Sequence, residues 1–503
     1  MIPRDGQRHK LRVVFDPGGR AKPSSATIEL PATGTSTTCR FGFRSSNVGR
    51  LNGRLTVLFR NRVLQTALAT SDDGFRIKIE SVVRPGLVDL SPRRAFDLAF
   101  VHNHDGDGNT SVTAMSDGWV AKVPPRQLST PIDLIRRLLT DAATNARAHT
   151  GLTSKATVTL MFKLARHGRM LRNLVVPPGD PEHLGDPTAS PYVQVVSADP
   201  SAIFPVELFY DFPTPNLPPT LCPNAANALS VGRCDPAKYH GAPSPNGTIP
   251  VVCPAGFWSM NRVIERYASP RDLIPDLVGH DFLVRSEPIG NRNHLGDLSN
   301  ALFAYSDLVE KQDAKMVSDA LAAATNGKAR AVDTWTAWLD SIKSEGPGLL
   351  VLLSHTDQDK ELLETALIIS RKEECRSGEF GRLYVRDEKF PDNSDDTRPG
   401  PLVFLLGCDT ARVLTEYQSF VVLFRENHAA LVVGTVASVA ARHAPSVAAK
   451  LVQELAARTA AGAARRAEAF GDVLLSARRQ LLSDGEVMAL CLTSYGDADW
   501  RFG

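Results

Sequence analysis

Long apolar runs, an excess of charge of one sign and a dense set of cysteines are all missing from this sequence. The 503 residues hold no uninterrupted apolar stretch near the roughly 18 residues of a transmembrane helix. The first residues also lack an apolar run of signal-peptide length. Seven cysteines are few and odd in number, which is unusual for a disulfide framework. We therefore expect a cytoplasmic protein, without a membrane partner, whose reduced thiols are available for metal binding or catalysis.

Neither the net charge nor the common catalytic and nucleotide-binding motifs point to a function. The formal net charge is +2, and no basic run is interleaved with aromatic residues, which argues against a nucleic acid partner. A G-x-S-x-G elbow, a P-loop and a G-x-G-x-x-G after a strand are all absent from the sequence. Hydrophobic residues at 43% and charged residues at 22% are typical of a globular protein. A chain of this length predicts two or three domains.

What the sequence does contain first is a β-rich beginning. Short alternating runs such as LRVVF, ATIEL, CRFGF and RLTVLF are separated by clusters of Gly, Pro, Ser and Asp. This rhythm predicts a small sandwich-like domain over residues 1–125, which we expect to serve recognition or regulation. Residues 126–290 begin with a predicted helix near residues 129–148 and continue as a proline-rich segment.

Residues 291–503 alternate between strands and helices. GLLVLLSH and PLVFLLGC are continuous apolar runs of the kind found in buried parallel strands, and helical patterns separate the strands. Short strands are also expected in ELLETALIIS and GRLYVRDE, and a last one in VMALCLTSYG. This alternation predicts an α/β fold with a mostly parallel sheet flanked by helices.

Two of these strands run into reactive side chains. GLLVLLSH ends at His355 and PLVFLLGC ends at Cys408, which follows His355 by 53 residues. Because ligands bind at the carboxyl ends of parallel strands, an imidazole and a thiol would meet at one edge. That arrangement suits a cysteine nucleophile with a histidine base, and caspases separate the two by about 50 residues. The alternative is ordinary: a buried structural thiol and a structural histidine.

The residues around the thiol add detail. Gly407 permits a tight exit from the strand, and the run from Asp409 starts a helix whose amides could lower the thiol pKa. The backbone N–H of Cys408, together with one near Thr356, are the candidate oxyanion donors.

The motifs LLSHTD and LLGCDTA resemble the paired His and Cys motifs of the CHAT domain, a family of caspase-like peptidases related to separase. The run FRENHAALVVGTVASVAARHAPSVAAKLVQEL, the tail SYGDADWRF and the segment YVQVVSADPSAIFPVELFYD are also similar to CHAT patterns. The resemblance covers roughly residues 132–503. It implies a caspase-like core, with Cys408 as nucleophile and His355 as general base.

Two departures from the CHAT pattern bear on specificity. Thr356 stands where these domains often have glycine, and VASVAARHAP lacks the usual tryptophan and aspartate. In separase-like peptidases, an acid in that region helps to bind a basic P1 side chain. Asp357, Asp359 and Asp409 are candidate replacements in the S1 pocket, although each could equally cap a turn. The other histidines that could compete for the role of base are His428 and His443.

A second group of thiols lies in an irregular segment. Cys222, Cys234 and Cys253, with His240 between the last two, offer the ligands of a closed tetrahedral zinc site. Cys222 and Cys253 both precede proline, which would hold them on rigid turns. The spacing is not the tight C-x₂-C of a zinc knuckle, so three separate buried thiols remain the alternative.

Three functional hypotheses follow. The first is a cysteine endopeptidase that cuts a protein partner, in the bacterial defence or cell-death setting that the CHAT resemblance implies, after an activating protein or ligand binds the N-terminal domain. The second is a catalytically inactive scaffold or signalling pseudoprotease with the same fold. The third is a non-proteolytic hydrolase or a redox-active thiol protein. A structural zinc is the one cofactor expected, and catalysis needs none.

Overall fold

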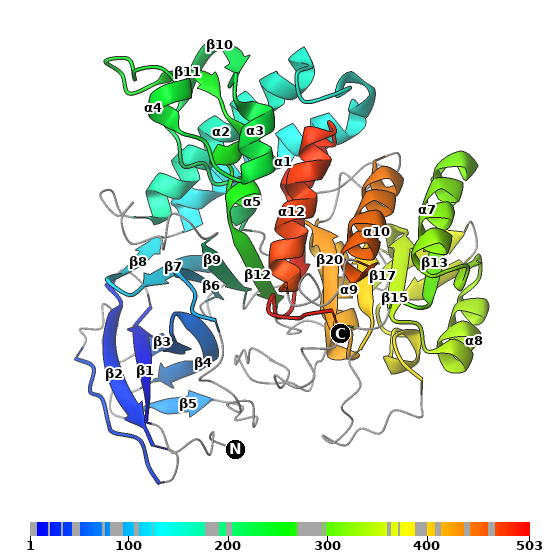
Figure 1. The fold of residues 1–503 in the computed structure, drawn as a ribbon. Helices are drawn as coiled ribbons and strands as arrows, with labels where there is room; N and C mark the ends of the chain where they lie inside the picture. The colour runs from blue at the N-terminus through cyan, green and yellow to red at the C-terminus, as the bar shows by residue number, and fades with distance from the viewer. Residues whose placement is uncertain are drawn as a thin grey trace. The chain divides into compact units, whose positions relative to one another are not determined.

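The computed structural model describes most of the chain, and its ranges are 8–18, 21–31, 34–42, 51–72, 76–80, 94–104, 110–123, 125–176, 191–197, 204–268, 295, 298–359, 364–370, 373–387, 400–407, 414–436, 443–460 and 468–502. The chain divides into two compact units, and each unit is made of three segments that alternate with those of the other along the sequence (Figure 1). Unit 1 comprises Met1–Thr130, Asn173–Ala202 and Glu265–Ile289. Unit 2 comprises Pro131–Arg172, Ile203–Ile264 and Gly290–Gly503.

Unit 1 is built from β-strands in two sheets. The first is antiparallel, in the order β2-β1-β3-β4-β5, and in the second β12, β9, β6, β7 and β8 follow one another. The strands are β1 (His9–Asp16), β2 (Ser24–Leu30), β3 (Leu51–Phe59), β4 (Arg62–Ser71), β5 (Lys78–Glu80), β6 (Leu98–His104), β7 (Thr110–Ser116), β8 (Trp119–Val123), β9 (Tyr192–Ser197) and β12 (Val263–Ala268).

The two sheets of unit 1 pack face to face. Val14 and Leu58 from the first sheet share one buried cluster with Val101 and Met115 from the second. The expected all-β N-terminal region is therefore confirmed. Its second sheet also contains β9 and β12, which lie far beyond residue 125 in the sequence. The strand expected in CRFGF is not formed by Cys39–Gly42, the part of this run that the structure describes.

A buried ionic network ties three strands of unit 1 together. Arg62 Nη1 on β4 lies 3.3 Å from Glu265 Oε1 on β12, and both side chains are almost fully buried. Gln194 on β9 donates to the same carboxylate at 2.9 Å and accepts from the Val63 backbone N–H at 2.7 Å. Because a buried charge is costly unless it is paired and hydrogen-bonded, this network fixes β9 and β12 beside β4.

The main sheet of unit 2 has the strand order β14-β13-β15-β19-β20-β21. The pairs from β14 to β20 are parallel, and β21 is antiparallel to β20. Its strands are β13 (Ala301–Tyr305), β14 (Ala329–Val332), β15 (Leu349–Leu353), β19 (Leu402–Leu405), β20 (Leu431–Thr435) and β21 (Leu492–Tyr495).

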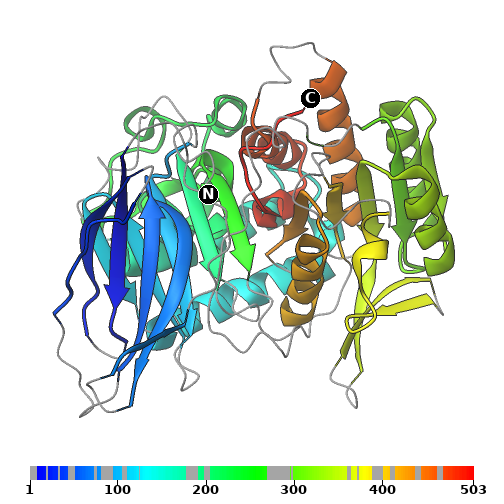
Figure 2. The same ribbon diagram turned by 90° about the horizontal axis from the view of Figure 1, so that it is seen from below.

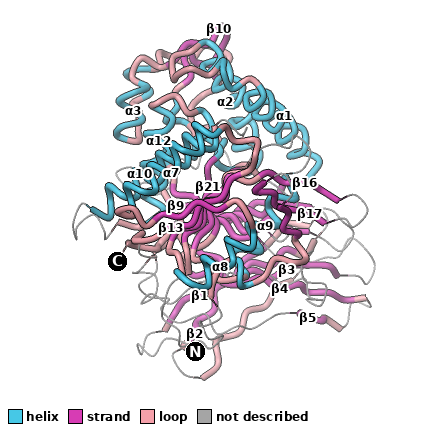
Figure 3. The backbone as a smooth tube through the Cα atoms, turned by 90° about the vertical axis from the view of Figure 1, so that its right-hand side faces the viewer, coloured by secondary structure: helices cyan, strands magenta, loops and turns pink. Residues whose placement is uncertain are grey.

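Helices cover this sheet. Helix α7 follows β13 and α8 follows β14, and because right-handed crossovers leave in opposite directions they lie on opposite faces. Figure 3 shows α7 and α10 on one side and α8 on the other. The helices are α7 (Lys311–Ala324), α8 (Trp335–Glu345), α9 (Leu414–Glu426), α10 (Ala444–Ala460) and α12 (Phe470–Ser483). The predicted α/β class, with a mostly parallel sheet flanked by helices, is confirmed.

A small antiparallel sheet follows β15. It has the order β16-β17-β18, made of β16 (His355–Asp359), β17 (Glu364–Ser370) and β18 (Glu373–Arg376). In Figure 2 its yellow strands extend below the main sheet of unit 2. The strand predicted in GRLYVRDE is wrong, because this segment contains the 3₁₀ helix η4 (Arg382–Tyr384). The last predicted strand, in VMALCLTSYG, is present as β21 (Leu492–Tyr495), although the first half of the segment forms the 3₁₀ helix η5 (Val487–Cys491).

The remaining part of unit 2 is a helical and irregular region. Its elements are α1 (Pro125–Thr144), η1 (Ala146–Ala148), α2 (Lys155–Val175), η2 (Val206–Leu208), β10 (Pro215–Leu221), α3 (Ala225–Val231), α4 (Pro236–Tyr239), β11 (Ile249–Val252), η3 (Pro254–Gly256) and α5 (Trp258–Asn261). Among the residues that the structure describes, no helix is both long and apolar enough to cross a membrane.

Candidate functional site

The carboxyl ends of β15 and β19 lie side by side. The two strands are parallel, with Leu352 opposite Leu405, and the Leu406 N–H donates to the Leu352 carbonyl at 3.0 Å. Every residue of both strands is buried, as their continuous apolar sequences predict. The chain therefore leaves both strands at the same level and the same edge of the sheet.

His355 follows β15 at this edge. Ser354 separates it from the strand, so that His355 is the first residue of β16 rather than the last of β15. Its side chain is half-buried, whereas Thr356 is buried and Asp357 is exposed. The alternation puts His355 and Asp357 on the more open face of β16 and Thr356 on the closed face.

On the neighbouring strand, the described residues stop at Gly407. This glycine is half-buried and lies two residues beyond the end of β19. Cys408 and Asp409 lie outside the residues that the structure describes. The side chain of Asp359 also lies outside them. Of the predicted pair, the structure thus describes His355, the candidate base, and the backbone up to Gly407 that leads to Cys408.

The two competing histidines occupy other positions. His428 lies two residues after α9 and has a positive φ of 73°, and its carbonyl lies against Gly400, just before β19 begins. It therefore lies at the amino-terminal edge of the sheet, opposite His355. His443 precedes α10, and its Nδ1 lies 3.5 Å from Glu486 Oε2.

Glu486 is a residue that the sequence did not single out. Burial acts to raise its pKa, but hydrogen bonds from His443 and Ser446 more than offset this and hold the pKa below its usual value. Its carboxylate thus orients His443 at the start of α10. Nothing in the sequence pairs the two, because 43 positions separate them along the chain.

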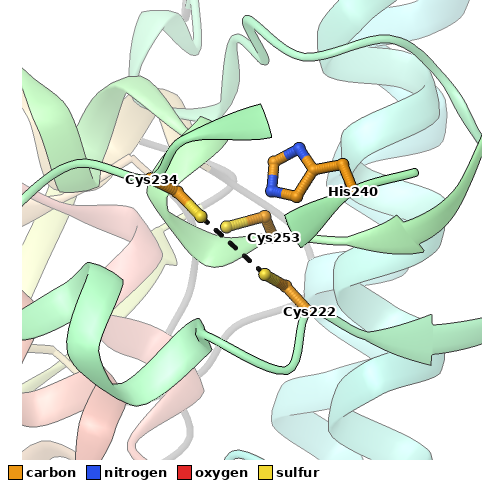
Figure 4. A group of neighbouring side chains, drawn as sticks. All are labelled: Cys222, Cys234, His240 and Cys253. Atoms are coloured by element: carbon orange, nitrogen blue, oxygen red, sulfur yellow. Dashed lines mark hydrogen bonds between the residues drawn. The ribbon is translucent and has the colours of Figure 1, made fainter. Parts of the chain in front are cut away.

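The second site is the Cys/His group in the irregular region, which the structure brings together. One ligand atom from each of Cys222, Cys234, His240 and Cys253 lies within 4.8 Å of all the others. Figure 4 shows the three sulfurs and the imidazole converging on one point. Cys222, His240 and Cys253 are buried, and Cys234 is half-buried.

Local structure explains how four distant residues meet. Strands β10 and β11 pair in parallel with Leu221 opposite Val252, so that Cys222 and Cys253 leave adjacent strand ends. Cys234 follows α3, which Gly232 ends in the left-handed conformation at φ 74°. His240 ends the short helix α4, whose first amides are capped by the Asp235 carboxylate.

The two Cys-Pro steps form matching turns. The backbone N–H of Asn224 bonds to the Cys222 sulfur, and that of Ala255 bonds to the Cys253 sulfur, two residues on in each case. The Asn224 side-chain amide also donates to Cys234 Sγ at 3.7 Å. Such N–H donors favour the thiolate form, which is the form that binds metal.

The pKa values of the three thiols diverge because they crowd one another. A hydrogen bond from the Cys253 thiol lowers the pKa of Cys222 to about 5. The pKa of Cys253 is raised far above its usual value, first by its bond to Cys222 and then by burial. Without a cation, only part of this group can be ionised at once.

The imidazole of His240 gives a further sign of fit. Both of its ring nitrogens are buried, and neither has a hydrogen-bond partner among the described residues. The ring makes an edge-to-face contact with the Phe212 ring, and the two ring centroids are 4.6 Å apart. A buried polar group without a partner is costly, and a metal bond to one nitrogen would satisfy it. The cluster can therefore bind a metal ion such as zinc, whose ligands are thiolate and imidazole.

The neighbouring backbone is held by an ionic hub. Asp211 accepts from Arg262 at 2.7 Å, from the Trp258 indole at 2.8 Å and from Arg172 on α2 at 3.3 Å. Tyr210, next along the chain, accepts from the Cys253 backbone N–H at 3.0 Å. Both acceptors, Tyr210 and Asp211, lie within the segment FYDF.

No family model and no curated protein sequence matches this chain. Among solved structures, it is similar to the Arg-specific cysteine proteinase gingipain R, at 12% identity over 62% of this chain and 64% of that one, with a TM-score of 0.31. A complex of Porphyromonas gingivalis RgpB pro- and mature domains matches at 12% identity over 70% and 71%, with a TM-score of 0.32. The separase–securin complex of Saccharomyces cerevisiae matches at 8% identity over 79% and 30%, with a TM-score of 0.36. The chain thus spans less than two thirds of the gingipain R chain.

Proposed function

We propose that this protein is a cysteine endopeptidase of the CHAT type, in which Cys408 is the nucleophile and His355 the general base. The observation that supports it is the alignment of β15 and β19. Their carboxyl ends are adjacent, with His355 two residues beyond one and Gly407 two residues beyond the other. Cys408 is the next residue after Gly407, and adjacent strands lie about 4.8 Å apart, within reach of two side chains.

The residues would divide the work as follows. His355 takes the thiol proton and later returns it to the leaving amine, and the thiolate attacks the scissile carbonyl. The backbone N–H groups of Thr356 and Cys408 receive the oxyanion, and Gly407 lets the backbone approach closely. Asp357, which is exposed, and Asp409 are the candidates to bind a basic P1 side chain.

The test is the pH dependence of Cys408 alkylation in the wild type and in His355→Ala, followed by mass spectrometry of each thiol. A free thiol with a pKa of about 8.5 reacts slowly at about pH 6. An activated pair predicts labelling of Cys408 at that pH at least about tenfold faster than in His355→Ala. His428→Ala is the matched control, because His428 lies at the opposite edge of the sheet, and it should label like the wild type.

Slow labelling of Cys408 that is indifferent to His355 would favour the catalytically inactive scaffold instead. Thr356 and the missing acid after VVGT are the features on its side. The assay should also be run with candidate activators, since caspase-like enzymes can be latent until a partner orders the active site.

The biological setting forms part of the same proposal. The CHAT resemblance implies a protein substrate and a bacterial defence or regulated cell-death system in the cytoplasm. The β-sandwich of unit 1 would then bind the activating protein or ligand. Its two sheets form a core of their own, which suits a separate recognition module.

We further propose that Cys222, Cys234, His240 and Cys253 hold a structural zinc. The support is the convergence of three sulfurs and an imidazole within 4.8 Å, in a region with few regular elements. Metal analysis of purified protein should find about one zinc per chain, and strong chelation should remove it. His240→Ala should lose the metal, and Cys39→Ser, in unit 1, should keep it. Equal zinc in both variants would count against the site.

A further inference from the structure

Two sulfurs of the Cys/His cluster lie close enough to bond to each other. Cys222 Sγ and Cys234 Sγ are 3.9 Å apart, and the dashed line in Figure 4 marks this contact. A disulfide joins two sulfurs at about 2.05 Å, so the pair has to close by about 2 Å. The segment between the two cysteines is short and holds only the helix α3, so its ends stay near each other during such a movement.

The three sulfurs of the cluster differ in their access to solvent. Cys234 is half-buried, whereas Cys222 and Cys253 are buried. A bound metal holds its cysteine ligands as thiolates, and the thiolate is the form that peroxides oxidise. A peroxide in the solvent therefore meets the Cys234 thiolate first, with the Cys222 thiolate directly beside it.

We propose that Cys222 and Cys234 form a thiol switch, in which a peroxide joins them as a disulfide and expels the metal. The inference rests on the proposed zinc site, because it names how that site is regulated. Cys253 and His240 are the two ligands that remain after oxidation. Since a structural zinc site is closed by four ligands, two are too few to retain the ion.

The oxidation takes place in two steps. The Cys234 thiolate attacks one oxygen of hydrogen peroxide, the O–O bond breaks and hydroxide leaves, which gives a sulfenic acid. The Cys222 thiolate then attacks the sulfenic sulfur, the S–S bond forms, and the S–O bond breaks with loss of a second hydroxide. The two sulfurs lose two electrons in total, and the peroxide gains them. A dithiol reductant reverses the reaction and restores both ligands.

The new bond acts on α12 through α3. Helix α3 lies between the two cysteines and ends at Gly232, where an added Cβ would lie 2.2 Å from the Arg479 guanidinium of α12. Arg479 Nε also donates to the Met260 carbonyl of α5 at 2.7 Å. Because closing the disulfide moves the ends of α3 and releases the metal, we expect it to loosen these contacts of α12.

The test uses full-length protein loaded with zinc. Hydrogen peroxide is added, and released zinc is followed with a chromogenic indicator. Trypsin cleavage after Arg233 and Lys238 places Cys222, Cys234 and Cys253 on three separate peptides, so mass spectrometry identifies the disulfide. We expect about one zinc to be released for each Cys222–Cys234 disulfide, and a dithiol with added zinc to restore the starting state.

Two variants and one exchange measurement complete the test. Cys234→Ser removes the thiolate that the peroxide meets first, so it should release zinc at least about tenfold more slowly than the wild type. Cys39→Ser is the matched control, because Cys39 is a half-buried thiol of unit 1, and it should respond like the wild type. If Cys234→Ser does not retain zinc, the disulfide map of the wild type decides by itself. Hydrogen exchange after oxidation should rise in α12 and stay constant in His9–Asp16.

Zinc release without a Cys222–Cys234 disulfide, a Cys222–Cys253 disulfide in its place, or oxidation that a dithiol does not reverse would each overturn the inference. So would a disulfide that leaves exchange in α12 unchanged, since the bond would then have no conformational effect. Failure of the proposed zinc site is separate. A protein that binds no zinc but forms the Cys222–Cys234 disulfide would uphold the thiol pair and sink the metal. A zinc-containing protein whose cluster resists peroxide would do the reverse.

Discussion

At the scale of single residues, the Cys/His cluster is surrounded by side chains from other parts of the chain: Phe212 packs against His240, and Asn224 donates to Cys234 Sγ at 3.7 Å. The cysteines and His240 could be proposed as a group because their chemistry is distinctive, and they converge in the structure. Tyr210, Asn224 and Phe212, which surround them, could not, because their roles depend on contacts across the fold. The same holds for Glu486, whose interaction with His443 appears only when α10 and the turn after α12 are in place.

Glu486 gives a prediction with a defined pH window. Its folded pKa is lowered by His443 and Ser446, so the unfolded chain binds this proton more readily. The stability it contributes is fully present above the unfolded glutamate value of about 4.3 and is lost as the pH falls through the lower folded pKa. Glu486→Gln should therefore lower the melting temperature most between about pH 5 and pH 7, with a difference that shrinks in more acidic buffer.

Thermal melts of both proteins across that range measure the effect. Ser446→Ala keeps the carboxylate and its contact with His443, so it should retain part of the pH dependence. A melting difference between Glu486→Gln and the wild type that stays constant down to about pH 3 would show that the pair does not shift the Glu486 pKa.

At the scale of elements, continuous apolar runs predicted the parallel strands well, because burial on both faces leaves a strong pattern. Short elements were harder. GRLYVRDE and VMALC have the residues of strands, yet they form 3₁₀ turns, and β18 is formed by EECR, a polar run. Strands of four residues carry too little periodicity to identify, and their neighbours decide their conformation.

Gly168 in the middle of α2 tests how elements dock in unit 2. A Cβ at this position would lie 1.9 Å from the Leu208 carbonyl oxygen of η2, a backbone atom. Alanine favours a helix over glycine by about 1 kcal/mol, but here it would push α2 away from η2. We expect Gly168→Ala to lower the free energy of unfolding by about 1–3 kcal/mol, as overpacking does.

Denaturant unfolding followed by circular dichroism measures this change. Gly151→Ala is the control, because a Cβ at Gly151 would meet nothing within 4 Å, and it should change stability by less than about 0.5 kcal/mol. A stabilised Gly168→Ala protein would mean that helix propensity outweighs the close approach of α2 to η2.

At the scale of the whole molecule, the way the two units alternate along the chain could not be predicted from the sequence. Unit 1 takes Asn173–Ala202 and Glu265–Ile289 from the middle of the chain. YVQVVS has the β-branched apolar residues of a strand, but periodicity does not tell which sheet a strand joins. That choice follows from tertiary contacts, such as the bond from Gln194 to Glu265.

The interleaving leads to a prediction about metal removal. The Cys/His cluster lies in unit 2, and its ligands tie together β10, α3, α4 and β11, which have little other regular structure. Unit 1 has its own core around Val14, Leu58 and Met115, and its own buried ion pair between Arg62 and Glu265. Stripping the metal should therefore weaken residues 215–262 and leave the first sheet of unit 1 intact.

Hydrogen exchange with and without a chelator separates the two regions. Peptides from residues 215–262 should exchange at least about tenfold faster after chelation, and those from His9–Asp16 and Arg62–Ser71 should not change. His240→Ala should reproduce the chelated pattern without a chelator. Equal loss of protection in both regions would mean that the two units unfold together, so that the cluster supports the entire chain. No change in either region would mean that the convergence of the four side chains contributes nothing to stability.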